Sequence, residues 1–260
     1  MRLTEWLFLG LAPVATWLES RFPRVPYRLL GRENRLNVKY FLLQNGLIYV
    51  GVVLVSALYA WRPPTWGLTA AGLSLPAQCV IMVLALDFRQ YVLHYCQHRF
   101  DFYWQFHKLH HGTTELSWLA YGRMHPLDFF FMVLGSSLAT TYALGANPLA
   151  WVLAYGVLDL VFSSFFAHLN VDLPRPDKLR WWARIIVTPN VHALHHSLAG
   201  QRPVNLGGVF MFWDVLFGTF ESPRERRPAF GVSGEFPTSF SGQLLHPLRY
   251  WSKRSAPAGP

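Results

Sequence analysis

The stretch DFRQYVLHYCQHRFDFYWQFHKLHH, residues 87–111, decides how this chain is built. It holds two histidine patterns. His94 and His98 are four residues apart, and His107 is followed by His110 and His111. Residues three or four positions apart lie on one face of a helix, so the imidazoles of each pattern converge. The first pair alone is weak evidence, because histidines at a helix interface would explain it equally well.

A third pattern repeats the second farther along the chain. The segment TPNVHALHHS, residues 188–197, places His192, His195 and His196 at the same spacing. Without a metal, so many packed imidazoles would be costly, because their rings would leave unpaired donors or repelling charges. We therefore predict that all three patterns bind metal.

The number of ligands predicts two metal ions. A structural or catalytic zinc needs only three or four protein ligands, which is fewer than the eight histidines in these patterns. Imidazole suits zinc, copper, iron and nickel. Two iron ions can activate O2 for attack on an unactivated C–H bond, whereas redox-inert zinc cannot. Soluble di-iron bundles use Glu-x-x-His motifs, which this chain lacks, so we expect a different, histidine-rich centre.

The composition indicates that part of the protein surface faces lipid rather than water. The chain is 52% hydrophobic and 14% charged, whereas globular proteins carry roughly 25% charged residues. The formal charge of +9 does not indicate nucleic acid, because the basic residues lie between apolar runs. Cys79 and Cys96 cannot form a disulfide framework, which favours a reducing compartment on the histidine side.

Four apolar runs predict two membrane-spanning helical hairpins. They cover residues 39–60 and 69–88, joined by WRPPTW, and residues 126–145 and 148–168, joined by LGANP. A run of about twenty residues crosses a hydrocarbon core of about 30 Å. A fifth run, 4–18, is short, and we expect it to cross tilted or to lie at the interface. The predicted fold is all-α, an integral membrane helical bundle of four to five spans with a histidine-rich cytoplasmic helical cap.

The distribution of Lys and Arg predicts the orientation. Residues 19–39 and the C-terminal part are basic, whereas the two hairpin turns carry one arginine or none. The positive-inside rule therefore places the basic segments and the histidines in the cytoplasm. We predict one domain, 1–260, in a bacterial inner membrane or the endoplasmic reticulum. Its cap comprises residues 89–125 and 169–250, and residues 251–260 are expected to be disordered.

The same patterns resemble a known family. Residues 87–111 are similar to the fatty acid hydroxylase/sterol desaturase superfamily of membrane histidine-box di-iron oxygenases. In that superfamily an Asp, a Tyr, His-x-x-x-His, a Trp and His-x-x-His-His occur in this order. Later segments agree: RMHPLD at 123–128, AHLN at 167–170, TPNVHALHHS at 188–197 and WDVLFGTF at 213–220. The resemblance extends from about residue 85 to residue 220.

The resemblance implies a set of ten histidines as ligands for two iron ions. The set is His94, His98, His107, His110, His111, His125, His168, His192, His195 and His196. His168 and His125 enter through the resemblance alone, and each has an alternative role. His125 could cap a helix that starts at Pro126, and His168 could anchor the end of a span at the interface. His246 lies outside every motif and is expected at the surface.

The sequence departs from family forms at three places. Gly112 stands where a serine usually follows the second pattern, and Ser164 stands where fatty-acid 2-hydroxylases tend to have a histidine. The segment QRPVNLGG keeps only Asn205 and Gly207 of a usual Asp-x-Asn-Tyr-Gly pattern. The substrate is therefore less well specified than the metal.

A metal-bound imidazole generally donates its other N–H to a carboxylate or a carbonyl. Beyond the metal ligands we assign no catalytic residue. The candidate acceptors are Asp87, Asp128, Asp159, Asn170 and Asp214. Asp128 and Asp159 lie in apolar runs, where polar pairing between helices is an alternative. Arg99 and Arg123 could pair with these acids or with phospholipid headgroups.

These features predict an O2-dependent enzyme that hydroxylates or desaturates a lipid, either fatty acyl, sterol-like or related. Electrons would come from an external NAD(P)H-linked donor, a ferredoxin-like or cytochrome-like protein, since no Gly-x-Gly-x-x-Gly or haem-attachment motif is present. The alternative is a non-catalytic metal-binding or metal-transport membrane protein, which predicts histidines within the spans rather than at their ends. A zinc hydrolase would need His-Glu-x-x-His, and only Glu115 lies near the ligands.

Overall fold

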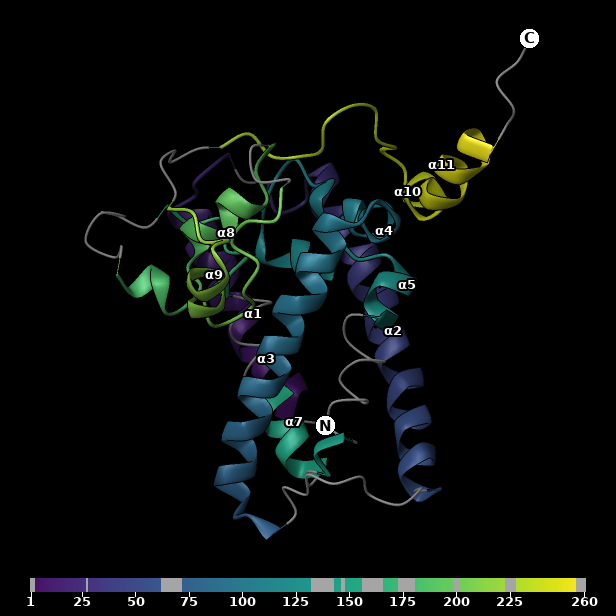
Figure 1. The fold of residues 1–260 in the computed structure, drawn as a ribbon. Helices are drawn as coiled ribbons and strands as arrows, with labels where there is room; N and C mark the ends of the chain where they lie inside the picture. The colour runs from purple at the N-terminus through teal and green to yellow at the C-terminus, as the bar shows by residue number, and fades with distance from the viewer. Residues whose placement is uncertain are drawn as a thin grey trace.

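The computed structural model describes residues 3–26, 28–61, 72–131, 143–145, 148–155, 166–172, 181–198, 202–222 and 228–255. Over these ranges the chain is helical, and its only β-structure is isolated bridges. The prediction of an all-α fold is confirmed for this part of the chain (Figure 1).

Two long helices run from a cap of short helices toward the opposite end of the molecule (Figure 1). The long helices are α2 (Arg32–Ala60) and α3 (Leu75–Arg99). The remaining elements are α1 (Leu3–Arg21), α4 (Asp101–His111), η2 (Trp118–Gly122), α5 (Pro126–Phe129), α7 (Pro148–Tyr155), η5 (Trp182–Arg184), α8 (Pro189–His195), α9 (Phe212–Phe217), α10 (Phe240–Leu244) and α11 (His246–Ser255).

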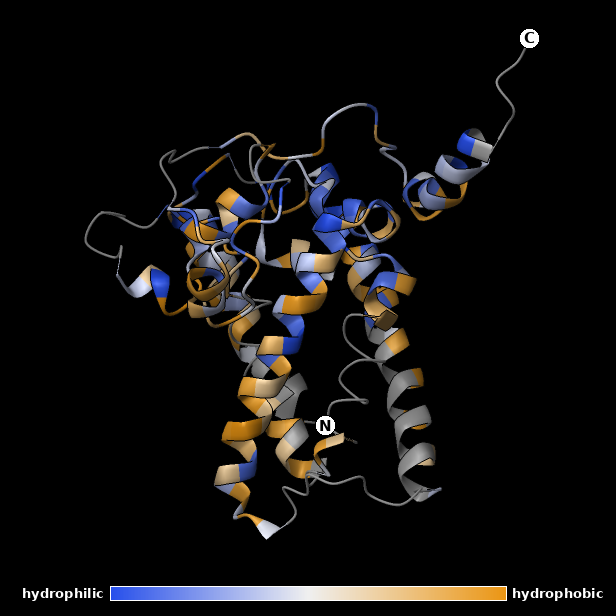
Figure 2. Ribbon diagram, viewed as in Figure 1, coloured by the Kyte–Doolittle hydropathy of each residue, from blue (hydrophilic) through white to orange (hydrophobic). Residues whose placement is uncertain are grey.

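Helix α3 joins the apolar end of the molecule to the histidine-rich cap. It begins at Leu75, with a proline in its first turn, and continues unbroken through His94 and His98. The extended backbone at Phe100 ends α3 and turns the chain directly into α4. Figure 2 shows α3 as apolar far from the cap and increasingly polar toward it. The sequence predicts that a span ends at residue 88 and the cap begins at residue 89. In the structure this boundary is a change from apolar to polar residues within the single helix α3.

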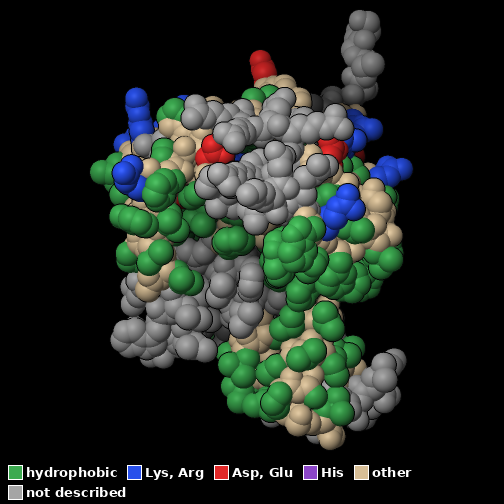
Figure 3. Space-filling model, turned by 90° about the vertical axis from the view of Figure 1, so that its left-hand side faces the viewer, with side chains coloured by type: hydrophobic (Ala, Val, Ile, Leu, Met, Phe, Trp, Pro, Cys, Tyr) green, Lys and Arg blue, Asp and Glu red, His purple; other side chains and the backbone are tan. Residues whose placement is uncertain are grey.

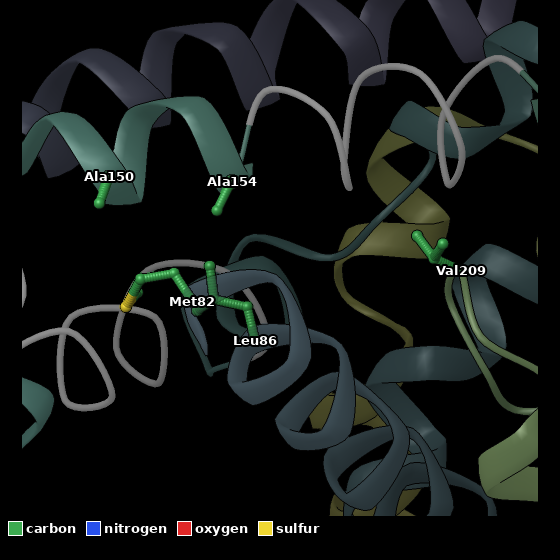
Figure 4. Packing of buried hydrophobic residues seen from close by; sticks show 5 residues of the cluster. All are labelled: Met82, Leu86, Ala150, Ala154 and Val209. Atoms are coloured by element: carbon green, nitrogen blue, oxygen red, sulfur yellow. The ribbon is translucent and has the colours of Figure 1, made fainter. Parts of the chain in front are cut away.

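Small residues bring α7 close to α3. Met82 and Leu86 of α3 are buried, and they pack in one cluster with Ala150 and Ala154 of α7 (Figure 4). Both pairs are four residues apart, so each pair lies on one helix face. Alanines allow two helix backbones to approach closely, as is common between helices in membranes. Val209, from the loop before α9, joins the same cluster and connects it to the cap.

Among the described residues, α3 is the one helix long and apolar enough to cross a membrane by length and composition. The predicted span 39–60 falls within α2. Most of the predicted span 126–145, the middle of 148–168 and the turn after Trp61 lie outside the described residues. The number of four to five spans therefore stays a prediction.

The C-terminal helix extends farther than the sequence predicts. Residues 251–255, expected to be disordered, form the end of α11. Trp251 stacks on Phe102 of α4, with ring centroids 5.1 Å apart, and Arg254 forms an ion pair with Asp101 at 2.9 Å. These contacts hold α11 against α4, so residues that resemble a polar tail are ordered by tertiary packing.

Candidate metal centre

Nine histidines meet at the cap end of α3 and form two groups. The first group comprises His94, His98, His107, His111 and His195. The second group comprises His110, His168, His192 and His196. Within each group one ring nitrogen from every histidine lies within 4.8 Å of all the others. The structure thus brings together all eight histidines of the three patterns and adds His168.

The distances between ring nitrogens are suitable for one metal ion in each group. In the second group the Nε2 atom of His168 lies 3.3 Å from that of His110 and 3.0 Å from that of His192. In the first group the Nε2 atoms of His94 and His107 are 3.2 Å apart. Nitrogens about 2.1 Å from one ion lie about 3 Å apart when they are neighbours in an octahedron. The imidazoles therefore already stand at the separations of shared ligands.

Burial favours the neutral form of most of these imidazoles. Eight of the nine are buried, and His98 is half-buried. Burial, followed by the repulsion of neighbouring imidazoles, holds the pKa of six histidines of α4 and α8 well below the usual value. These six are His107, His110, His111, His192, His195 and His196. A neutral imidazole has a lone pair to offer a metal, so the group is ready to bind at neutral pH.

The buried ring nitrogens also need partners. Both nitrogens of His111 and the Nε2 atom of His195 are buried without a hydrogen bond to any described residue. A buried polar atom left in this state costs free energy. Ligation by a metal would satisfy these atoms, and imidazole is a ligand that iron accepts. The donor set of the two groups therefore fits the metal that the sequence predicts.

Asp128 orients His107. Its carboxylate accepts a hydrogen bond from Nδ1 of His107 at 3.0 Å and a second one from the Gln97 side chain. Because Nδ1 of His107 carries the proton, its Nε2 lone pair points toward the group. Asp128 occupies the role expected of it from the sequence, whereas the part of Gln97 carries no sequence signal.

A loop supplies backbone acceptors to two more ligands. His94 donates from Nδ1 to the carbonyl of Leu206 at 2.8 Å, and His195 donates from Nδ1 to the carbonyl of Val204 at 2.9 Å. Asn205, between them, has a φ of 54°, a left-handed conformation that asparagine tolerates. Its side chain bonds to the backbone of Glu221 in both directions. Sequence analysis missed these carbonyls, because any residue can provide them.

Asp214 holds that loop instead of contacting an imidazole. Its carboxylate accepts hydrogen bonds from the backbone N–H groups of Leu206 and Gly207, both at 2.8 Å, and from the Thr219 hydroxyl at 2.7 Å. A Cβ atom at Gly207 would lie 2.5 Å from the carbonyl oxygen of Phe210. The tight turn therefore requires glycine at this retained family position.

Asp87 and Asn170 also bind backbone. Asp87 accepts from the N–H groups of Val209 and Phe210 at 2.8 and 3.1 Å, and it anchors the same loop to α3. The Asn170 side chain bonds to the backbone of Val25 in both directions, which fixes the segment that carries His168. The sequence suggests both residues as acceptors for ligating histidines, but the structure shows each of them bonded to backbone instead. Asp159 lies outside the described residues.

His125 is not brought into either group. It is the N-cap of α5, where Nδ1 accepts a hydrogen bond from the N–H of Leu127 at 3.1 Å. Its Nε2 lies 3.1 Å from the carbonyl of Leu244 and donates to it. Both ring nitrogens are thus engaged in hydrogen bonds. Nδ1 serves as a cap because α5 begins at Pro126 and its first N–H groups need an acceptor. In the structure His125 therefore has the alternative role that the sequence allows, that of a helix cap. His246, expected at the surface, is half-buried against Phe236.

One departure from family forms has a local explanation, and the same region shows the partner of Arg123. A Cβ atom at Gly112 would lie 2.5 Å from the ring of Phe236, which takes the space that a serine side chain would need. Arg123, buried, donates to the carbonyl of Gly112 at 3.1 Å and forms an ion pair with Glu33 at 2.5 Å. Arg123 therefore pairs with an acid, one that the sequence did not single out. Ser164 lies outside the described residues.

Two groups of mostly buried imidazoles, at the end of a helix that begins as an apolar segment, form a candidate metal centre of the histidine-box kind. The profile of the fatty acid hydroxylase family matches residues 79–219, more than half of the chain. The chain belongs to this family, as the sequence patterns indicate. No solved structure matches the chain.

Three relatives place the chain among characterised members. It is 33% identical over 173 residues to the ornithine lipid hydroxylase OlsE of Rhizobium tropici, covering 66% of this chain and 50% of the relative. It is 22% identical over 253 residues to the alkylglycerol monooxygenase of Xenopus tropicalis, covering 87% and 49%. It is 25% identical over 159 residues to methylsterol monooxygenase 1-3 of Arabidopsis thaliana, covering 57% and 52%. The chain spans about half the length of these relatives.

Proposed function

We propose that this protein is an O2-dependent di-iron membrane oxygenase that hydroxylates or desaturates a lipid. The observation that carries the proposal is the pair of imidazole groups, of five and four histidines, each of which could hold a metal ion. The relatives are named for an ornithine lipid, an alkylglycerol and a methylsterol. All three are lipids, so we assign a fatty acyl, sterol-like or related lipid as the substrate class.

Bound iron would supply the redox chemistry that O2 activation requires. The protein's own residues hold and orient the ligands. Asp128 and the carbonyls of Val204 and Leu206 fix which ring nitrogen of three histidines carries the proton. Burial of the imidazoles excludes bulk water from the reacting centre. A rigid centre of this kind can align one C–H bond of a bound lipid, and such positioning supplies much of a rate enhancement.

The course of α3 supports access from the bilayer. Its exposed side chains Val80, Leu84, Phe88 and Val92 recur every four residues and form one apolar stripe. This stripe leads along the helix toward His94 and His98. We infer that α3 crosses the membrane within a bundle of four to five spans and that the centre lies at its cytoplasmic end. The membrane would be a bacterial inner membrane or the endoplasmic reticulum.

Electrons would come from a separate NAD(P)H-linked protein, ferredoxin-like or cytochrome-like. Exposed arginines on the cap, at positions 28, 32, 35 and 249, favour an acidic partner. Iron-loaded protein should therefore be inactive with NADPH alone and active after a reductase and its carrier are added. Turnover with NADPH as the sole addition would contradict this part of the proposal.

Metal analysis and lipid mass spectrometry test the whole proposal. The purified protein should contain about two irons per chain. Cells expressing it should accumulate a lipid that has gained one oxygen or lost two hydrogens, and only with O2. A His110→Ala variant should lose both iron and product. Iron binding without any O2-dependent product would instead favour the non-catalytic metal-binding alternative, and a single zinc with O2-independent activity would exclude an oxygenase.

A further inference from the structure

The cap exposes an apolar surface on η5 and α9 that the metal centre does not use. We name it the α9 patch, and it consists of Trp181, Trp182, Ile185, Val215, Leu216 and Phe217. Leu216 is 68% exposed and Trp181 is 56% exposed. The two parts are joined by a hydrogen bond from the N–H of Met211 to the carbonyl of Ile185 at 2.9 Å. Large apolar side chains exposed together on neighbouring elements in this way indicate a site of interaction.

The α9 patch continues the apolar stripe of α3. The ring of Phe88, which belongs to that stripe, stacks against Phe217 with centroids 6.1 Å apart and planes at 27°. Tyr91 also stacks on Phe217, at 5.4 Å. The exposed face of α9 is therefore an extension of the surface that α3 would present to lipid.

Charge is segregated on this side of the molecule. In Figure 3 the charged side chains of the described residues lie in the upper half of this face, and the described side chains below them are largely hydrophobic. Trp181 and Trp182 are stacked with centroids 3.9 Å apart. The sequence just before them contains Arg175, Lys178 and Arg180. Tryptophan beside basic residues is typical of the headgroup region of a membrane.

We propose that the α9 patch is seated in the lipid interface on the cytoplasmic side of the bilayer, an inference that rests on the membrane location proposed above. Its consequence concerns the metal centre. Asp214, in α9, holds the backbone of Leu206, and the carbonyl of Leu206 accepts from His94. Contact between α9 and lipid would therefore fix the depth of the first histidine group relative to the headgroups.

Site-specific fluorescence quenching tests this seating in the full chain. Cys79 and Cys96 are replaced by alanine, and single cysteines are introduced as Leu216→Cys, Leu84→Cys and Leu248→Cys. Each variant is labelled with bimane and reconstituted into phosphatidylcholine and phosphatidylglycerol vesicles containing doxyl-labelled lipid. Leu248, on α11, is the matched control, because it is 65% exposed but does not belong to the patch. Iron content equal to that of the unlabelled protein is required of each variant.

The bimane at position 216 should be quenched by doxyl lipid at least twice as strongly as that at position 248. Quenching at 216 no greater than at 248 would overturn the proposal. Quenching at 84 but not at 216 would remove the patch from the membrane and leave the α3 span in place. Protection of 216 from both doxyl lipid and aqueous iodide would place a protein or a second copy there, and would also overturn it. Strong quenching at 216 without lipid oxidation would count against the proposed function alone.

Discussion

The two histidine groups are built differently although both draw residues from α4 and α8. In the first group, His94, His107 and His195 each donate a hydrogen bond from Nδ1–H to a carbonyl or a carboxylate. In the second group, Nδ1 of His192 and Nδ1 of His196 are buried without a hydrogen bond to any described residue. Three rings of the first group are therefore oriented by hydrogen bonds to a carbonyl or a carboxylate, a support that the Nδ1 atoms of His192 and His196 lack among the described residues.

This difference predicts unequal metal binding. Hydrogen bonds to the far side of a ligating imidazole fix its tautomer and raise its basicity. The first group, with three such bonds, should hold its ion more tightly than the second. His111 links the two groups, because its ring stacks on that of His196 at 4.6 Å with planes at 22°. The groups are thus distinct in support but mechanically coupled.

Replacing the linking histidine should have the largest effect. His111→Ala removes a ligand of the first group and the ring against which His196 packs. We expect both ions to be lost and product to fall below detection. Elemental analysis of the purified protein and lipid mass spectrometry measure the two losses. His246→Ala is the control and should keep its metal, since that residue belongs to neither group. Retention of two ions by the His111 variant would show that the two groups are not coupled through this residue.

Removing the carboxylate behind His107 should have the next largest effect. Asp128→Asn deletes the charged acceptor that fixes the tautomer of this ligand. Loss of such a partner weakens metal affinity by about 10- to 100-fold. Competition with a chelator should show one weakened ion and one that is little changed. Asp101→Asn, at an exposed acid that pairs with Arg254, is the control. Unaltered affinity in the Asp128 variant would show that the orientation of His107 depends on packing.

The sequence predicts the ligands better than their supports. The spacing within TPNVHALHHS, its counterpart in α4 and the His94–His98 pair is sufficient to predict eight histidines that converge, because helix geometry places the rings of each pattern together. His168 required the family resemblance, since a lone histidine carries no spacing. The carbonyls of Val204 and Leu206 could not be predicted, because a backbone oxygen has no residue type. His125 shows the limit of a motif, because a histidine before proline fits both a ligand pattern and a helix cap, and the structure places it at the cap of α5.

The loop that supplies those carbonyls offers a more selective change. Asp214→Asn leaves every ligand in place but weakens the contacts to the N–H groups of Leu206 and Gly207. We expect affinity to fall only in the first group, by less than about 10-fold, because His94 is affected through the backbone. Stepwise chelation should then show the two ions leaving at more similar concentrations. An unchanged or wider separation would refute the assignment of tighter binding to the first group.

The smallest effect should follow from His125→Ala, and it separates a cap from a ligand. Its Nδ1 caps α5 and its Nε2 bonds to the carbonyl of Leu244, so the substitution removes two hydrogen bonds to backbone. Loss of a helix cap costs about 1 kcal/mol. We expect thermal unfolding in detergent at a slightly lower temperature, with both ions retained. Ser239→Ala, which removes the cap of α10, is the matched control and should show a similar loss of stability. If the His125 variant lost an ion and the Ser239 variant did not, His125 would belong to the metal centre after all.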